Sequence, residues 1–236
     1  MNVFFDRVTL ISSAGKIPWK VAEEGYRNLK SLCSSIAIIE KNTDLPFPDV
    51  VVEPELKVLL HESQIQSVVH ANIDFRRWDY RVSPIVSVSL PLLVFGRKAL
   101  YTVVLLHEFL HYLYLSMKFL ESDFFSLHLK VGDTATGRLI FDEVGQISPK
   151  NVVKSKYLIN LVTEKFRHVI NDRKFISTIE NKWIGRNLPV INLRSQDFAV
   201  RLSPSDFTSL YFPDAVLKRA RQLLENASGM PRASNE

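Results

Sequence analysis

Two histidines and a glutamate within five consecutive residues are the part of this chain best suited to chemistry. They are His107, Glu108 and His111, in the order His-Glu-Phe-Leu-His. On an α-helix, residues four apart lie on one face, so both imidazoles can reach one cation. Glu108 lies beside them and can take a proton from a water bound to that cation. This arrangement is typical of a zinc hydrolase.

The segment around this motif predicts a long buried helix over about residues 98–120. It contains no glycine or proline, and Gly96 lies just before it. Apolar residues surround the motif on nearly every side of such a helix, which favours burial. Two histidines and a glutamate in that setting cost free energy unless they are paired or bind a metal. The alternative interpretation is a core helix whose histidines make ordinary hydrogen bonds.

This helix resembles that of the zincin metallopeptidases. The similarity extends to neighbouring apolar positions, namely Val104, Phe109, Leu110 and Leu113. It covers about residues 83–147. The resemblance implies an α+β, zincin-like fold, in which a mixed sheet with a cleft-bordering edge strand packs on the buried HExxH helix. A mostly helical C-terminal part follows, and Zn²⁺ is the implied cofactor.

A catalytic zinc usually has a third protein ligand. The residue six positions after His111 is not a histidine, which excludes the metzincin branch of the family. Gluzincin-like enzymes take a glutamate from a later helix. Glu143 is the first candidate, because a helix over residues 139–147 would direct it to an apolar face. Glu164 is the second candidate, although its spacing from His168 also fits a helical ion pair.

The resemblance implies a zinc-dependent metallopeptidase, in which Glu108 activates a zinc-bound water to hydrolyse peptide bonds. The expected partner is a peptide or protein substrate. His168 is a candidate for stabilising the oxyanion of the transition state, a role that zincins often give to a downstream His or Tyr. A catalytically inactive zincin-like interaction protein is an alternative. So is a regulatory protein that acts on a transcriptional repressor, which only the basic helix near the C-terminus supports.

A strand is expected just before the metal helix. Residues 86–90 alternate apolar and polar side chains, the period of a half-buried strand. Pro84 and Pro91 bracket it, which indicates an edge strand or a strand end. An extended substrate could pair with such an edge, with Val86 and Val88 as its binding residues. A plain edge strand without a ligand is the alternative.

Composition limits the class of protein. The 236 residues are 46% hydrophobic and carry a net charge of +5 without a marked Lys/Arg run, so nucleic acid is not expected as a partner. Cys33 is the single cysteine, which excludes an intrachain disulfide and fits a reducing, cytoplasmic setting. Residues 99–120 are long enough to cross a bilayer, but the further spans that a membrane protease needs are missing. No membrane span is therefore expected.

The rest of the chain predicts one domain over residues 1–225. It divides into an α/β part over about 1–96, the metal helix and a helical part over about 138–225. Residues 226–236 have the composition of a disordered tail. Further strands are expected over residues 2–11, 35–40 and 50–52, and further helices over residues 18–32, 54–71, 149–171 and 213–224.

Overall fold

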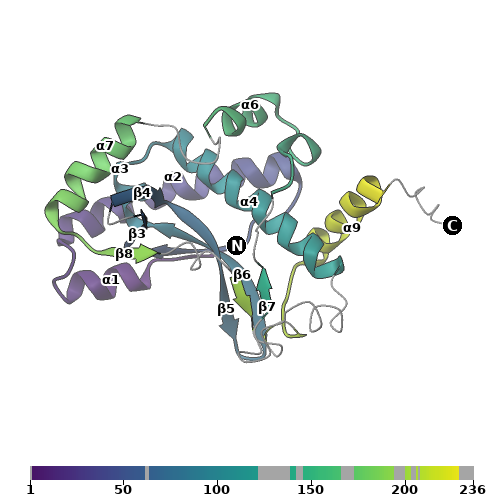
Figure 1. Cartoon of the computed structure of the whole chain (residues 1–236), viewed down its shortest axis with the longest axis horizontal. Helices are drawn as coiled ribbons and strands as arrows, with labels where there is room; N and C mark the ends of the chain where they lie inside the picture. The colour runs from purple at the N-terminus through teal and green to yellow at the C-terminus, as the bar shows by residue number, and fades with distance from the viewer. Residues whose placement is uncertain are drawn as a thin grey trace.

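A mixed four-stranded sheet lies at the centre of the computed structural model, with helices packed against it (Figure 1). The structure describes residues 2–61, 64–121, 139–141, 146–165, 173–193, 200–202, 206 and 208–228. The first elements are β1 (Val3–Phe4), α1 (Asp6–Ser13), α2 (Trp19–Thr43), β2 (Asp49–Glu53), β3 (Leu56–His61), β4 (Gln64–Val69), β5 (Ala71–Trp78), β6 (Arg81–Ser89), α3 (Leu90–Phe95) and α4 (Lys98–Glu121). The later elements are β7 (Leu139–Phe141), η1 (Pro149–Asn151), α6 (Lys156–Lys165), α7 (Arg173–Lys182), η2 (Ile184–Arg186), β8 (Val190–Leu193), β9 (Val200–Leu202) and α9 (Asp214–Ser228). The chain is therefore of the α+β class, as the sequence predicts.

The main sheet has the strand order β1-β2-β6-β5. Strands β1, β2 and β6 are parallel, and β5 runs antiparallel to β6 at the edge. The register places Val50 opposite Val86 and Val52 opposite Val88, and all four side chains are fully buried. Helix α4 packs on β5 and β6 and also contacts α2, α6 and α9. The long central helix is thus enclosed on several sides.

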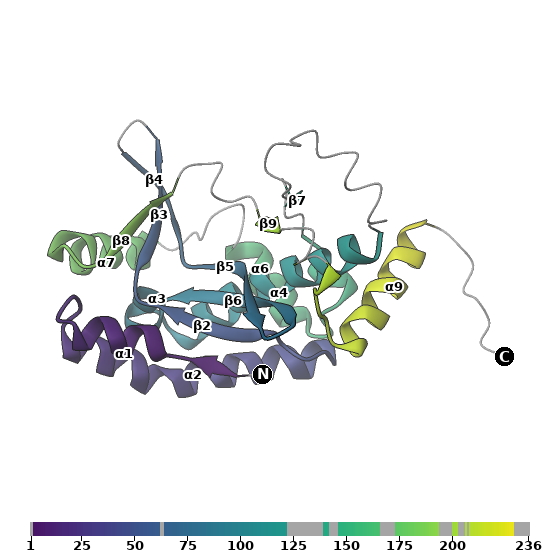
Figure 2. The ribbon, with the colours of Figure 1, turned by 90° about the horizontal axis from the view of Figure 1, so that it is seen from below.

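A second, three-stranded sheet begins where the chain leaves the first. Strands β3 and β4 form an antiparallel hairpin, and β8 pairs with β3 in parallel. Figure 2 shows this hairpin projecting from the body of the molecule. The chain leaves the main sheet at the end of β2, runs through the hairpin and returns at His70 to form β5. The carboxyl end of β2 therefore lies at the junction of the two sheets.

The helix expected over residues 54–71 is wrong, because β3, β4 and the start of β5 occupy this segment. Leu56 and Val58 are buried, whereas Lys57 and Leu59 between and after them are only partly buried. This alternation has the period of a strand rather than of a helix. Pairing with β8, which lies more than 100 residues later, fixes the segment as a strand.

The expected strand at residues 35–40 is also wrong, because α2 continues without a break to Thr43. Ser35, Ile36 and Ile39 are fully buried, at the spacing of one helix face. Burial of this face outweighs the weak helix preference of its β-branched residues. The strand expected over residues 2–11 shrinks to β1, and α1 follows it.

The C-terminal part is less helical than expected. Residues 139–141 form β7, paired with β9, where a helix was expected over 139–147. The helix expected over 149–171 divides into η1 and α6, and residues 166–171 lie outside the described ranges. The helix near the C-terminus is confirmed, but it runs to Ser228, so residues 226–228 are helical rather than part of a tail.

The corner between α3 and α4 sets the direction of α4. The Tyr101 hydroxyl lies 2.7 Å from the Leu93 carbonyl oxygen, to which it donates a hydrogen bond, and 3.0 Å from that of Gly96. A β-carbon on Gly96 would collide with the Leu92 carbonyl oxygen and lie 2.7 Å from Cε1 of Tyr101. The corner therefore requires glycine for space, since both neighbours belong to fixed structure.

We predict that Gly96→Ala lowers the free energy of unfolding by about 1–3 kcal/mol, the usual range for an overpacked site. Chemical denaturation followed by circular dichroism measures the change. Gly185→Ala is the control, because a β-carbon there would meet the Glu180 carbonyl oxygen at the milder distance of 3.3 Å. Equal stability of Gly96→Ala and the parent would show that the corner can widen at little cost.

Candidate metal centre

Helix α4 carries His107, Glu108 and His111 through the interior of the protein. Its neighbours on the helix are almost all buried, and Glu108 is only 6% exposed. The ring of Phe109 stacks on Phe47 at a centroid distance of 5.4 Å. The helix is therefore held by apolar packing, with Glu108 buried and the two histidines partly exposed.

The two histidines face one another, one turn apart. Their Nε2 atoms are 3.0 Å apart, and the ring planes are nearly perpendicular at 83°. Two Zn–N bonds of about 2.0–2.1 Å in a tetrahedral arrangement would hold such nitrogens roughly 3.3 Å apart. The observed separation is close to this value, so the pair fits a shared cation with small ring movements.

Burial keeps the His107 imidazole neutral. It lowers the pKa of His107 to about 3, and the neighbouring His111 lowers it further in the same direction. A neutral imidazole has the lone pair that a metal ligand needs. The electrostatics of the helix therefore favour the ligand form of His107 over the protonated form at neutral pH.

Glu108 is in the opposite situation. Burial raises the pKa of its carboxyl group to about 8, and the positive charge of Lys57 partly offsets this. A carboxyl with such a pKa is mostly protonated at neutral pH without a further positive charge nearby. Next to a divalent cation Glu108 would be ionised, because an opposite charge lowers a carboxyl pKa.

The third ligand is not found among the described residues. No group of three His, Cys, Asp or Glu side chains that could hold a metal occurs in this part of the chain. Glu164, the second candidate, is exposed near the end of α6 and does not join the histidine pair. Glu143, the first candidate, and His168 both lie outside the described residues.

The strand expected just before α4 is confirmed as β6, but it does not lie at an edge of the sheet. Strand β6, which contains Val86 and Val88, is paired on both sides, with β2 and with β5. Both valines are fully buried, so neither can contact an extended substrate. Pro84 is tolerated because β2 pairs with β6 only from Ile85 onward. The two edge strands are β1 and β5, and β5 contacts α4.

Comparisons of the chain with protein-family models, with curated proteins and with solved structures find no match. The case for a metal centre therefore depends on the geometry of α4. Among the described helices, none is long and apolar enough to cross a membrane.

Several polar residues at the junction of the two sheets were missed from the sequence. Lys57 lowers the pKa of Glu108 and lies 2.8 Å, Nζ to Oδ1, from Asn72 on β5. His70 is 5% exposed at the turn into β5, and its ring lies 4.9 Å from that of Phe175. The mistaken helix over residues 54–71 concealed them, because only strand pairing brings these residues beside the sheet.

We predict that His70 makes the fold sensitive to acid. Burial lowers its pKa from 6.5 to about 4, so the unfolded chain binds the proton more readily. The stabilisation is therefore present above pH 6.5 and is lost as the pH falls toward 4. It amounts to on the order of 3 kcal/mol.

Denaturation midpoints of the parent and His70→Gln across this pH range measure the effect. His70→Gln should lose less stability on acidification than the parent does. Identical pH dependence in the two proteins would mean that His70 does not titrate differently on folding.

Proposed function

We propose that this protein is a zinc-dependent metallopeptidase of the zincin type, with His107 and His111 as metal ligands and Glu108 as general base. One observation carries the proposal. Two imidazoles with Nε2 atoms 3.0 Å apart lie on one turn of helix α4, which also carries the buried carboxyl group of Glu108. Three ionisable groups concentrated in an apolar helix have a desolvation cost that a bound metal would offset.

The residues divide the work of peptide hydrolysis. Zinc, when bound, supplies a Lewis acid that polarises a carbonyl and acidifies a water. His107 and His111 would hold the metal from one face of the helix. Glu108 accepts the proton of the attacking water and then delivers it to the leaving amine. The low polarity around Glu108 strengthens these charge interactions, because screening by water is weak there.

Glu143 is the proposed third ligand and His168 the proposed oxyanion donor. Both assignments come from the resemblance to gluzincin-like enzymes and from the sequence around these residues. No group of three metal-binding side chains occurs among the described residues, so the proposal takes the third ligand from elsewhere in the chain. Helix α4 cannot supply it from Glu121, since ten residues at 1.5 Å each place Glu121 about 15 Å from His111.

The proposed substrate is an extended peptide that lies along β5. This strand forms the edge of the main sheet and contacts α4, so a chain paired with its outer edge would run beside the motif. Backbone pairing would give affinity with little sequence preference. This assignment replaces Val86 and Val88 on β6, which are buried inside the sheet.

An inactive zincin-like interaction protein is the competing function. The raised pKa of Glu108 is the observation in its favour, because a protonated carboxyl group cannot act as a general base. Hydrolysis of peptides separates the two functions, whereas zinc content alone does not. An inactive protein could bind zinc but would not hydrolyse peptides.

We predict that Glu108→Gln retains zinc and loses about 100- to 10,000-fold in peptide hydrolysis, the usual contribution of a general base. The amide has the shape of the carboxyl group but accepts no proton, and the raised pKa of Glu108 means that a neutral group fits the site. Cleavage of a fluorogenic peptide library measures the change.

Glu121→Gln is the matched control on the same helix. Glu121 is exposed and paired with Lys118, so its loss should leave hydrolysis unchanged. If Glu108→Gln cleaved peptides as fast as the parent, the general-base role would be wrong.

We predict that His111→Ala reduces bound zinc from one equivalent per chain to a trace, because one imidazole cannot hold the metal in the remaining site. Atomic absorption of the dialysed protein gives the metal content. His70→Gln is the control, since His70 lies on the sheet away from the histidine pair and should leave zinc in place. Full zinc content in His111→Ala would remove the metal site itself.

A further inference from the structure

A small polar cavity lies at the junction of the two sheets, at the carboxyl ends of the parallel strands β2 and β6. Its volume is about 10 Å³, close to the minimum that holds one water molecule. Side chains and backbone from four strands and the turn at His70 line it. The lining residues are Glu53, Glu55, Lys57, His70, Asn72, Ser89 and their neighbours.

Three buried polar atoms of this lining have no hydrogen-bond partner among the described residues. They are Nδ1 of His70 and the Oγ atoms of Ser87 and Ser89. Their side chains belong to residues that are 5%, 2% and 5% exposed, respectively. Buried polar groups are nearly always satisfied, so three such atoms around one cavity indicate that something occupies it. The strand register explains their gathering, because Glu53 lies opposite Ser89 and Asn72 opposite Ser87.

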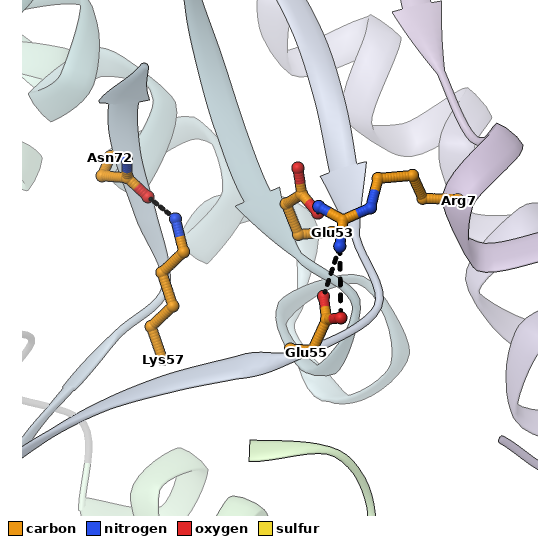
Figure 3. A network of polar contacts seen from close by, with 5 residues as sticks. All are labelled: Arg7, Glu53, Glu55, Lys57 and Asn72. Carbon is orange, nitrogen blue, oxygen red and sulfur yellow. Dashed lines mark hydrogen bonds and ion pairs between the residues drawn. The ribbon is translucent and has the colours of Figure 1, made fainter. Parts of the chain in front are cut away.

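The charges around the cavity favour a positive occupant. Glu53 and Glu55 share the guanidinium of Arg7, which binds both (Figure 3). Lys57 also lines the cavity and is directed to Asn72, as the same view shows. Besides Arg7 and Lys57, the charges that act on Glu53 are those of Glu55 and Asp74, so three carboxylates face two cations and a negative charge remains. Burial raises the pKa of Glu53, although Arg7 and Lys57 both lower it.

The lining atoms also restrict the kind of cation. Hydroxyl oxygens, a carboxylate and a neutral imidazole nitrogen all offer lone pairs, as a cation requires. A divalent ion would need more charged ligands, and no group of three His, Cys, Asp or Glu side chains occurs in the described part of the chain. A weakly held monovalent ion matches a set that consists mainly of neutral oxygens and one or two carboxylates.

We propose that this cavity binds a monovalent cation about as large as a water molecule, K⁺ or ammonium, between Ser87, Ser89, His70 and Glu53. The ion joins the end of β2 to β6 and to the turn that begins β5. It thus stabilises the point where the projecting hairpin leaves the main sheet. This site is separate from the histidine pair on α4 and does not depend on the proposed peptidase activity.

The test compares the thermal stability of the whole protein in KCl, in NH₄Cl and in choline chloride at matched ionic strength. Choline is too large for the cavity, so it serves as the reference cation. We expect Tm to rise by about 2–4 °C in K⁺ or ammonium, and the rise should saturate with concentration as for a single site. Equal rises in both salts indicate ion binding, and a rise in ammonium alone indicates that hydrogen-bond donation is required.

Variants locate the effect. Ser89→Ala and Glu53→Gln should each abolish the dependence on K⁺ or ammonium, whatever they do to the stability in choline. Ser116→Ala is the matched control, because the buried Ser116 hydroxyl lies 2.7 Å from the Leu113 carbonyl oxygen, to which it donates, on a different element. It should keep the whole increment.

Two outcomes would overturn the proposal. If Tm of the parent is the same in all three salts, the cavity holds water only. If Ser89→Ala and Glu53→Gln both keep the full increment, the cation binds elsewhere. Crystals soaked in a rubidium salt give an independent readout, and the expected anomalous peak lies between Ser87, Ser89 and Glu53.

Discussion

The burial of ionisable groups inside one apolar helix is the constraint on which the rest of this structure depends. Helix α4 contacts the sheet, α2, α6 and α9, so Glu108 has little access to water, whereas His107 and His111 are partly buried. Burial moves the pKa of His107 down and that of Glu108 up, and each shift favours the neutral form. A divalent cation would reverse the preference of Glu108 but not that of His107, because a neutral imidazole already has the form that binds metal. The motif is thus prepared electrostatically for a positive partner.

The strand order determines what can approach that helix. A parallel core with one antiparallel edge places β6 in the interior and leaves β5 as the outer strand beside α4. The same order gathers polar residues at the carboxyl ends of β2 and β6, where the chain departs into the hairpin. Lys57 links the cavity between the sheets to the motif on α4, since it lines the cavity and its charge acts on Glu108. Apolar side chains therefore fill one face of the main sheet, and the polar ones meet at its end.

The sequence predicted well what depends on local pattern. The helix over residues 98–120 is confirmed as α4 because a continuous apolar run without glycine or proline leaves few alternatives. The strand before it, the strand at 50–52 and the C-terminal helix are confirmed for similar reasons. The helix prediction for residues 54–71 was wrong because the pairing of Leu56 with Val190 is a long-range contact that no local pattern indicates. The prediction that residues 86–90 form an edge strand failed for the same reason, because an alternating sequence is compatible with an edge strand and with an interior strand. Ser87 shows the difference, being polar and yet almost fully buried.

Chain geometry decides how the proposed metal centre could be completed. Residues four apart on a helix bring two ligands to one point, but a third ligand on the same helix would lie on a different face or too far along the axis. A tetrahedral site with two ligands on α4 therefore needs a donor from another element. The neighbours that contact α4 within the described residues offer no such donor beside the histidines. Glu143, the proposed third ligand, lies outside the described residues. The two histidines are thus a local consequence of helical spacing, whereas the third ligand depends on how the chain returns to the helix.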